Sequence, residues 1–264
     1  MLIIGEKINT TKKSINAAVE AKDAEAIQNE AKRQLEAGAN IIDVNTGTRI
    51  KTEVADMEWL VNTIQEVTDS QLCIDSPNPA ALNAGLKLCK HKALLNSITA
   101  EKDRIDAIMP MVKDFGSSVV ALTMDESGMP KTGEDRLRIA SKIIEMISDY
   151  NIPMDDVYFD PLIQPVGSNP DQGTAVLEGI KLLRSSFPDV HIICGLSNIS
   201  YGLPERKLLN RSFLAMAMSV GLDSAIMDPT DKSLMATAIA SDAILARDEF
   251  CLNYISSWRQ GRFE

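Results

Sequence analysis

Short polar side chains follow most of eight apolar runs in this sequence, and they are all Asp or Asn: Asn9, Asp43, Asn45, Asp75, Asn96, Asp160, Asn198 and Asp228. A carboxylate accepts hydrogen bonds from paired N–H groups, and an Asn amide supplies both a donor and an acceptor. If they gather in one place, such groups suit a neutral heterocycle rich in N–H and C=O groups. They do not suit a phosphate or a metal ion.

The apolar runs themselves have the length and composition of short strands. They are Leu2–Ile4, Ile41–Val44, Leu72–Ile74, Ala93–Leu95, Val119–Leu122, Val157–Phe159, His191–Cys194 and Ala225–Met227. They recur roughly every 30 residues, which is the length of a strand–helix unit, and helix-like segments separate them. This pattern predicts an α/β fold with one (β/α)₈ barrel domain over residues 1–264. The carboxyl ends of the strands form the active-site mouth of such a barrel.

Helix signals lie between the runs. Asn78 stands before a Pro and is expected to be an N-cap, as is Thr132 before an acidic first turn. Gly38 and Gly221 predict helix ends directly before two of the runs. One face of the expected helix over residues 135–150 carries Leu137, Ala140, Ile143, Ile144 and Ile147. Two long loops containing Gly or Pro are expected to form substrate walls: Asp125–Lys131 and Pro161–Pro170, which includes Gln164.

Each polar residue also has a structural interpretation that the sequence leaves open. Asp75 could cap the next helix, although Asn78 can supply that cap. Asp160 could form a turn with the Pro that follows it, and Asn96 could close an Asx-turn. Asn198 lies close after Gly195, which would let a ligand ring approach the backbone.

Alternation along a strand places further residues at the same mouth. Asp43 and Asn45 are two positions apart on one run, so both are expected to point into the barrel. Asn9 follows the first run in the same way.

Composition excludes several classes of protein. The net charge is −10, which argues against a nucleic-acid or anionic-membrane surface. The N-terminus lacks a basic segment followed by an apolar stretch, so no signal peptide is expected. No run approaches the roughly 20 apolar residues of a membrane span. No glycine-rich nucleotide motif is present.

The cysteines and histidines show no spacing typical of disulfide bonds or metal sites. The four cysteines have no paired spacing, and reduced, buried thiols in a cytoplasmic protein are expected. The two histidines lie in no ligand-spaced cluster, so no metal site is predicted. His191 begins a run and is interpreted as structural. The segment from Phe213 to Met218 is interpreted as helix packing.

Five strings of the sequence resemble a known family. They are Ile3–Asn9, Ile42–Asn45, Cys73–Ser76, Phe159–Leu162 and Gly195–Asn198, with further similarity over Arg206–Leu214 and Gly221–Ile226. These strings resemble the pterin-binding methyltransferases, in particular the methyltetrahydrofolate:corrinoid/iron–sulfur protein methyltransferases. The resemblance covers essentially the whole chain, in order.

The resemblance implies a TIM barrel whose mouth holds the pterin ring of tetrahydrofolate or 5-methyltetrahydrofolate. It implies that Asp75, Asn96 and Asp160 hydrogen-bond the pterin edge and that Asn198 lies near the methyl-bearing nitrogen N5. It also implies a homodimer and a separate corrinoid-binding protein as the source of cobalamin. Further residues are expected near the pterin with less support: Gly195, Ser197, Asn9, Asp43, Asn45, Gln164 and Arg206.

The resemblance further implies methyl transfer between the N5 of the folate and the cobalt of the corrinoid, in either direction. No His or Lys is placed to protonate N5, so Asn198 is expected to be catalytic by accepting a hydrogen bond from the protonated nitrogen. Three alternatives remain. A pterin-binding barrel without transferase activity is one, and an unrelated barrel enzyme for an amide-like substrate is another. The third is a dihydropteroate synthase-like enzyme, whose Ser-x-Arg-Pro-Gly pattern is lacking at Thr46–Ile50.

Overall fold

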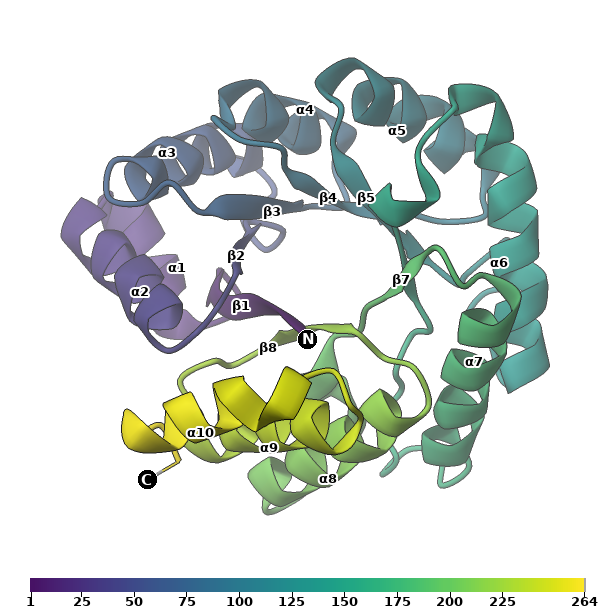
Figure 1. Cartoon of the computed structure of the whole chain (residues 1–264). Helices are drawn as coiled ribbons and strands as arrows, with labels where there is room; N and C mark the ends of the chain where they lie inside the picture. The colour runs from purple at the N-terminus through teal and green to yellow at the C-terminus, as the bar shows by residue number, and fades with distance from the viewer. Residues whose placement is uncertain (264) are drawn as a thin grey trace.

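Eight parallel strands surround one axis and alternate with helices, as seen along that axis in Figure 1. The computed structural model describes residues 1–263. Neighbouring strands pair in the order β7-β6-β5-β4-β3-β2-β1-β8. The ring closes between β8 and the segment just after β7, where the backbone N–H of Ile226 donates to the carbonyl of Cys194 at 2.9 Å. The predicted (β/α)₈ barrel in one domain is therefore confirmed.

The strands lie close to the predicted runs. They are β1 (Leu2–Asn9), β2 (Ile41–Asn45), β3 (Gln71–Asp75), β4 (Leu94–Ile98), β5 (Ser118–Leu122), β6 (Val157–Asp160), β7 (His191–Ile192) and β8 (Ser224–Met227). Three differ most in length. β4 continues past Leu95, the predicted end, to Ile98. β1 continues to Asn9 through an irregularity between Gly5 and Ile8. β7 is shorter than predicted because the chain leaves β6 after Ile192, and Gly195 then bridges to β8.

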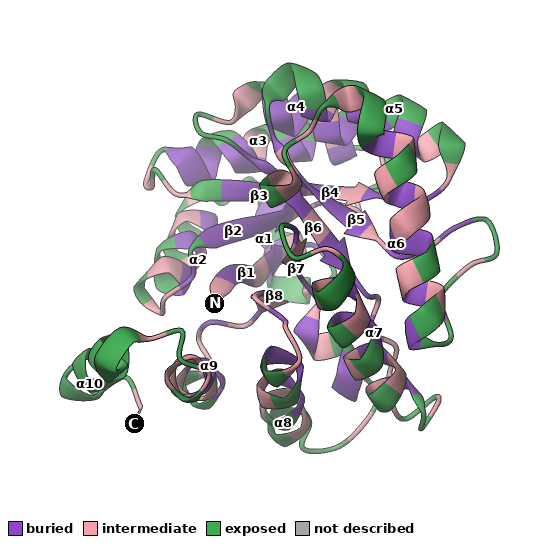
Figure 2. Cartoon of the chain, turned by 45° about the vertical axis from the view of Figure 1, so that its right-hand side comes forward, coloured by how far each residue is buried: buried purple, intermediate pink, exposed green. Residues whose placement is uncertain are grey.

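Helices cover the outside of the barrel. They are α1 (Lys13–Ala21), α2 (Ala24–Glu36), α3 (Glu53–Gln65), α4 (Pro79–Leu88), α5 (Lys102–Phe115), α6 (Gly133–Ile147), α7 (Gln172–Ser186), α8 (Arg206–Ser219), α9 (Lys232–Ile244) and α10 (Leu252–Arg259). Figure 2 shows buried strands and helices whose outer faces are exposed. The last helix, α10, projects from the barrel beside α9 and is almost wholly exposed.

The predicted helix ends agree with the structure. The side chain of Asn78 accepts a hydrogen bond from the N–H of Ala80 at 3.0 Å, so Asn78 caps α4. Thr132 caps α6 in a reciprocal capping box with Asp135. Gly38 and Gly221 both take positive φ just after helices, a conformation that glycine adopts without steric cost.

The predicted apolar face of α6 is partly wrong. Leu137 is only half-buried, whereas Ile139 and Arg136 are fully buried. A buried arginine cannot be anticipated from apolar periodicity, because backbone carbonyls supply its partners. The helix also ends at Ile147, and a short 3₁₀ turn continues to Tyr150.

The inside of the barrel has an apolar floor. It is formed by Ile4, Ile41, Cys73, Leu94, Val120 and Ile193. Side chains two positions apart on a strand share a face, so the residues two positions after these point to the same interior. That rule places Asp43, Asp75 and Asn96 above the floor, toward the carboxyl ends of the strands, here called the mouth.

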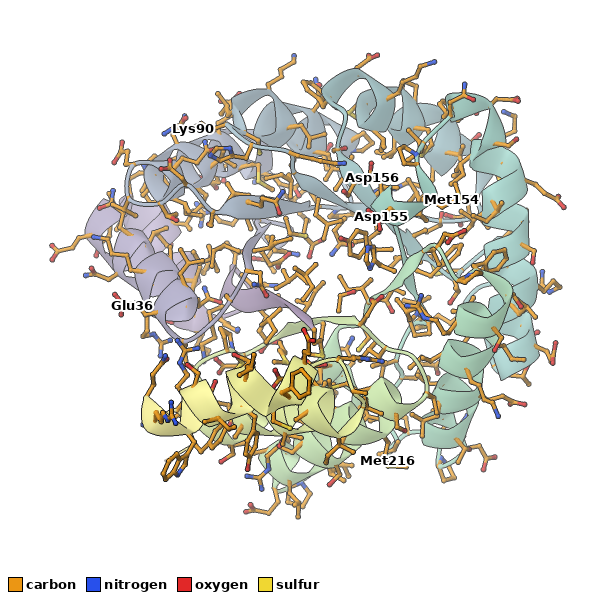
Figure 3. The ribbon with its side chains drawn as sticks, viewed as in Figure 1. Glu36, Lys90, Met154, Asp155, Asp156 and Met216 are labelled. Carbon is orange, nitrogen blue, oxygen red and sulfur yellow. The ribbon has the colours of Figure 1, made fainter. Side chains whose placement is uncertain are left out.

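Other sequence predictions have mixed outcomes. The cysteines are free, but only Cys73 and Cys194 are buried, and Cys251 is exposed in the turn before α10, contrary to prediction. In α8, Phe213 and Met218 pack in the core, whereas Met216 is exposed on the outer surface (Figure 3). No helix within residues 1–263 is long and apolar enough to cross a membrane.

His191 lies at the opposite end of the barrel from the mouth. Its Nδ1 is 3.1 Å from a carboxylate oxygen of Asp223, and its ring stacks on Tyr158. Its Nε2 lies 3.1 Å from Asp155, one of the acids labelled in Figure 3. These contacts fit the structural role predicted for His191, since they link neighbouring strands and loops.

Candidate active site at the mouth of the barrel

Three of the predicted residues lie side by side on adjacent strands. Asn45 pairs in register with Asp75, and Asp75 pairs in register with Asn96. The Nδ2 of Asn45 donates a hydrogen bond to an oxygen of Asp75 at 2.6 Å. These strands therefore present a carboxylate between two amides at one side of the mouth.

Asp75 is not the cap of the following helix, because Asn78 supplies it. Burial raises the pKa of Asp75 to about 6, while the hydrogen bond from Asn45 and the charge of Arg104 act in the opposite direction. The carboxyl group is thus mostly ionised at neutral pH and can accept hydrogen bonds from a ligand.

Asn96 is almost completely buried, at 9% exposure, and its side chain is hydrogen-bonded to the thiol of Cys73. The structure shows no Asx-turn at Asn96; its backbone carbonyl instead accepts from the N–H of Ser76. An Asn fixed in this way offers its remaining polar atoms to the mouth.

Arg104 of α5 fastens the loops after β3 and β4. Its guanidinium donates to the backbone carbonyls of Ser76, Pro77 and Ser97 at 2.6–3.2 Å. Sequence reasoning missed this residue because its partners are backbone atoms, which leave no signal in the sequence.

Asp160 is the last residue of β6, and its side chain forms the turn that was one of its two predicted roles. Its Oδ1 accepts from the N–H of Leu162 at 2.7 Å, and its carboxyl group also accepts from the N–H of Gly195. Burial nevertheless raises its pKa to about 6. The turn and a ligand contact are compatible, since a carboxylate has about four acceptor positions.

Arg136 of α6 holds the same turn from behind. Its guanidinium donates to the carbonyls of Pro161 at 2.6 Å and Leu162 at 3.1 Å. The helix opposite makes room for it, because a Cβ on Gly179 would lie 2.4 Å from its Cδ.

Asn198 lies in a short 3₁₀ helix, η3 (Leu196–Ser200), directly after β7. It is exposed, and its side-chain amide makes no hydrogen bond within residues 1–263. Its Nδ2 would be 3.2 Å from a Cβ on Gly195, so the glycine leaves the space that Asn198 occupies. The hydroxyl of Ser197 donates to a carboxylate oxygen of Glu6 at 3.0 Å, which ties η3 to β1.

Glu6 and Lys7 are mouth residues that sequence reasoning missed. Glu6 accepts from Ser197 on one side and lies 3.7 Å from the ammonium of Lys12. Lys7 forms an ion pair with Asp228 at 2.8 Å, and this contact lowers the pKa of Asp228. The irregularity in β1 brings consecutive side chains into the mouth, and strict alternation does not predict it.

Three predicted residues make local contacts. Asn9 accepts from the backbone and hydroxyl of Thr11 at 2.9 and 2.7 Å. Gln164 donates to the carbonyl of Pro130 at 3.3 Å and so links the two long loops. Arg206 donates to the carbonyl of Ser197 at 2.7 Å and stabilises η3.

Asp43 is the most deeply buried acid of the set, at 2% exposure. Its Oδ1 has no hydrogen-bond partner in the described chain. Burial and the nearby charge of Asp75 raise its pKa well above its usual range. Neither Asp43 and its neighbours nor any other group of three or more His, Cys, Asp or Glu side chains within residues 1–263 is arranged to hold a metal ion.

Comparison with known proteins identifies the relatives of this barrel. The sequence profile of a family described as pterin binding enzyme matches residues 5–228. A methylcorrinoid:tetrahydrofolate methyltransferase from Eubacterium limosum is 38% identical over 99% of this chain and 97% of its own length. Methionine synthase from Mycobacterium tuberculosis is 31% identical over 86% of this chain, which corresponds to 20% of that longer enzyme.

Solved structures show the same fold at low identity. Dihydropteroate synthase from Yersinia pestis, solved with a pterine–sulfa conjugate, has a TM-score of 0.70 and 17% identity, covering 92% of this chain and 93% of its own. The 7,8-dihydropteroate synthase from Vibrio fischeri has a TM-score of 0.70 and 14% identity, covering 93% of each chain. The family profile spans most of the sequence and the Eubacterium enzyme matches it nearly end to end, so the chain belongs to the pterin-binding methyltransferase family.

Proposed function

We propose that this protein transfers a methyl group between the N5 of tetrahydrofolate and the cobalt of a corrinoid that a separate protein carries. The observation that carries the proposal is the set of buried carboxylates and amides at one barrel mouth, within a chain similar over its whole length to a methylcorrinoid:tetrahydrofolate methyltransferase. The reaction and its reverse use the same atoms, and the proposal covers both directions.

The polar set fits a pterin. Ionised Asp75 and Asp160 accept hydrogen bonds from the amino-pyrimidinone N–H groups, and Asn96 supplies a donor and an acceptor. Asn45 orients Asp75 through its 2.6 Å hydrogen bond. Gly195 leaves space beside the ring, and Ser197, Gln164 and Arg206 shape the loops that face it.

Asn198 is proposed to act on N5. An amine nitrogen is a poor leaving group unless it gains positive charge, so N5 must be protonated as the methyl group departs. A proton from solvent can serve, and the carbonyl oxygen of Asn198 accepts a hydrogen bond from the resulting N–H⁺. The amide is free to do so because it is exposed and has no other partner in the described chain.

The corrinoid is proposed to arrive on another protein. The one string that resembles a corrinoid motif, Asp189–Gly195, is one residue too long. Its His191 is held in β7 by Asp223 at the far end of the barrel. A ligand at that position would not reach the mouth.

A dihydropteroate synthase-like activity is disfavoured. That chemistry requires cations for a diphosphate. Arg49, after β2, is bound instead to Asp56 at 2.5 Å and to Asn16 at 3.1 Å. Its guanidinium is therefore occupied by residues outside the mouth.

We further propose a homodimer located in the cytoplasm. Exposed apolar side chains gather at the end of α9 and on α10, and a patch of this kind is typical of a protein interface. The free cysteines agree with a reducing compartment.

The test mixes the purified protein anaerobically with tetrahydrofolate and methylcobalamin. Loss of the methylcobalamin absorption with formation of 5-methyltetrahydrofolate supports the transferase. Binding of tetrahydrofolate without any methyl exchange, even with a range of corrinoid proteins, would favour a binding-only barrel. Absence of tetrahydrofolate binding would exclude the proposed function altogether.

A further inference from the structure

Asp43 has surroundings that an ionised carboxylate does not tolerate. It stands directly above the apolar floor, and its register partner across the sheet is Cys73. No Lys, Arg or His within residues 1–263 forms an ion pair with it, and Lys12, whose charge favours its ionisation, is paired with Glu6 instead. Burial strongly disfavours a charge without a partner, so such a group keeps its proton.

The groups that face Asp43 are themselves mostly acidic. Glu6 on β1 and Asp75 on β3 lie on the two strands that pair with β2, and both disfavour a further negative charge. The thiol of Cys73 is hydrogen-bonded to the carboxyl group and also holds its proton, since burial raises the pKa of Cys73. The hydrogen bond from Cys73 and the charge of Lys12 favour ionisation of Asp43, but burial and the acidic neighbours outweigh both, and burial lowers the pKa of Lys12 too.

One oxygen of Asp43 has no partner in the protein. The Oδ1 atom is buried and makes no hydrogen bond, although the carboxyl group is fixed by its other contacts. Buried polar atoms are nearly always satisfied, and the exceptions point to a role with a ligand. Asp43 shares the inner face of β2 with Asn45, which contacts Asp75, so a ligand bound by Asp75 lies over it.

We propose that Asp43 is a further substrate-binding residue, which stays a neutral carboxylic acid and hydrogen-bonds the deepest heteroatom of the pterin edge. The inference rests on the proposed function, because it takes the pterin as the ligand. A neutral acid beneath Asp75 offers both a donor and an acceptor. It also allows Asp75 to remain ionised, since two adjacent buried carboxylates cannot both carry charge.

The ligand contact is tested with two variants of matched size and a control. Asp43→Asn keeps a neutral donor and acceptor, whereas Asp43→Leu removes both. Calorimetry with tetrahydrofolate at neutral pH should give an affinity within about threefold of wild type for Asp43→Asn and a loss of about tenfold or more for Asp43→Leu. Asp69→Asn, at an exposed carboxylate, should bind like wild type. Unchanged binding by Asp43→Leu would overturn the proposed hydrogen bond between Asp43 and the pterin. Equal losses of affinity in both variants would overturn the proposal that Asp43 is a neutral acid.

The protonation state has a readout that needs no ligand. A folded protein that retains a proton on Asp43 loses stability as pH rises above about 4, because the unfolded chain releases that proton and the folded one does not. Asp43→Asn should therefore melt at a higher temperature than wild type at neutral pH, and this difference should vanish near pH 4. A lower melting temperature for Asp43→Asn at neutral pH would contradict the proposal.

The two proposals fail in different ways. If the wild-type protein neither binds tetrahydrofolate nor transfers a methyl group, the proposed function is wrong, and the ligand contact falls with it. If the wild type is active and Asp43→Leu binds equally well, the inference on Asp43 alone is wrong. The pH dependence of melting decides the protonation state in both cases.

Discussion

Asn198 differs from the other polar residues of the mouth because it is exposed and its amide is unbonded in the described chain, while Asp75, Asn96 and Asp160 are tied to neighbours. Binding groups benefit from being fixed before the ligand arrives. A group that must follow a change of charge on N5 needs freedom to turn its amide. The two kinds of residue should therefore respond differently to substitution.

We expect Asn198→Ala to reduce the rate constant of methyl transfer by about 100-fold while weakening tetrahydrofolate binding by less than about fivefold. The lost hydrogen bond forms mainly when N5 is protonated, so the transition state suffers more than the ground state. Single-turnover kinetics and calorimetry measure the two effects separately. Asn62→Ala, at an exposed position on α3, serves as the control. Equal losses in rate and affinity would assign Asn198 to binding alone.

Binding should also depend on pH through Asp75 and Asp160, the two carboxylates that we propose bind the pterin. The pKa values of Asp75 and Asp160 are raised to about 6, so each loses its charge as pH falls through that value. Tetrahydrofolate affinity should be full above about pH 7 and at least about tenfold weaker at about pH 5. Asp75→Asn should weaken binding at neutral pH and reduce this acid dependence. Affinity that stays constant from neutral to acidic pH would show that neither charge matters.

At the level of elements, strand positions could be predicted and their irregularities could not. Apolar runs bounded by turn residues located all eight strands, because burial on both faces of a parallel strand leaves a strong signal. The continuation of β1 through Lys7 and the early end of β7 depend on pairing between distant segments. Sequence patterns within one run carry no information on that pairing.

The same division applies to the site. The location of Asp75, Asn96 and Asp160 at the mouth could be predicted because each lies at the end of an apolar run. Arg104 and Arg136 could not, because their partners are backbone carbonyls. Supporting residues of this kind are found only from the folded backbone, and they lie on helices rather than on strands.

Arg136 provides the element-scale prediction. Arg136→Met keeps the apolar stem but leaves the carbonyls of Pro161 and Leu162 without their donor. Buried acceptors without partners should lower the free energy of unfolding by about 3 kcal/mol and loosen the turn that holds Asp160. Urea denaturation measures the first effect and tetrahydrofolate affinity the second.

Lys142 on the same helix is the matched control. It pairs at 2.6 Å with Glu126, whose carboxylate is exposed, and surface ion pairs of this kind contribute at most about 1 kcal/mol. Lys142→Met should therefore change stability little and leave affinity intact. A similar small effect for Arg136→Met would show that the turn after β6 holds its shape without α6.

For the whole molecule, the two ends of the barrel carry different roles. The mouth gathers acids that are costly to bury, such as Asp43 and Asp160. The opposite end contains satisfied pairs such as His191 with Asp223, whose contact raises the pKa of the histidine and lowers that of the acid. Buried acids lie at the mouth, and paired opposite charges lie at the other end. This distribution fits the division in such barrels, where the mouth serves activity and the opposite end serves stability.

The side of the molecule near the C-terminus carries a third feature, the apolar patch. It consists of Ile244, Phe250, Leu252, Tyr254, Ile255 and Trp258. Trp258 is 65% exposed, and an exposed Trp among other apolar side chains is costly in water. If a second copy of the chain covers this patch, the cost disappears in the dimer, and the patch should decide the oligomeric state.

We expect the double variant Leu252→Asp with Trp258→Asp to raise the dissociation constant of the homodimer by about 30-fold or more, because it places charge at the centre of the contact. Sedimentation equilibrium measures this constant. The variant should fold normally, since both side chains are exposed in the single chain. Met216→Asp, at an exposed apolar residue on α8, tests whether any surface charge has the same effect and should leave the dimer intact (Figure 3). If the wild-type protein sediments as a monomer at all concentrations, the homodimer is wrong, and the patch must bind a different partner.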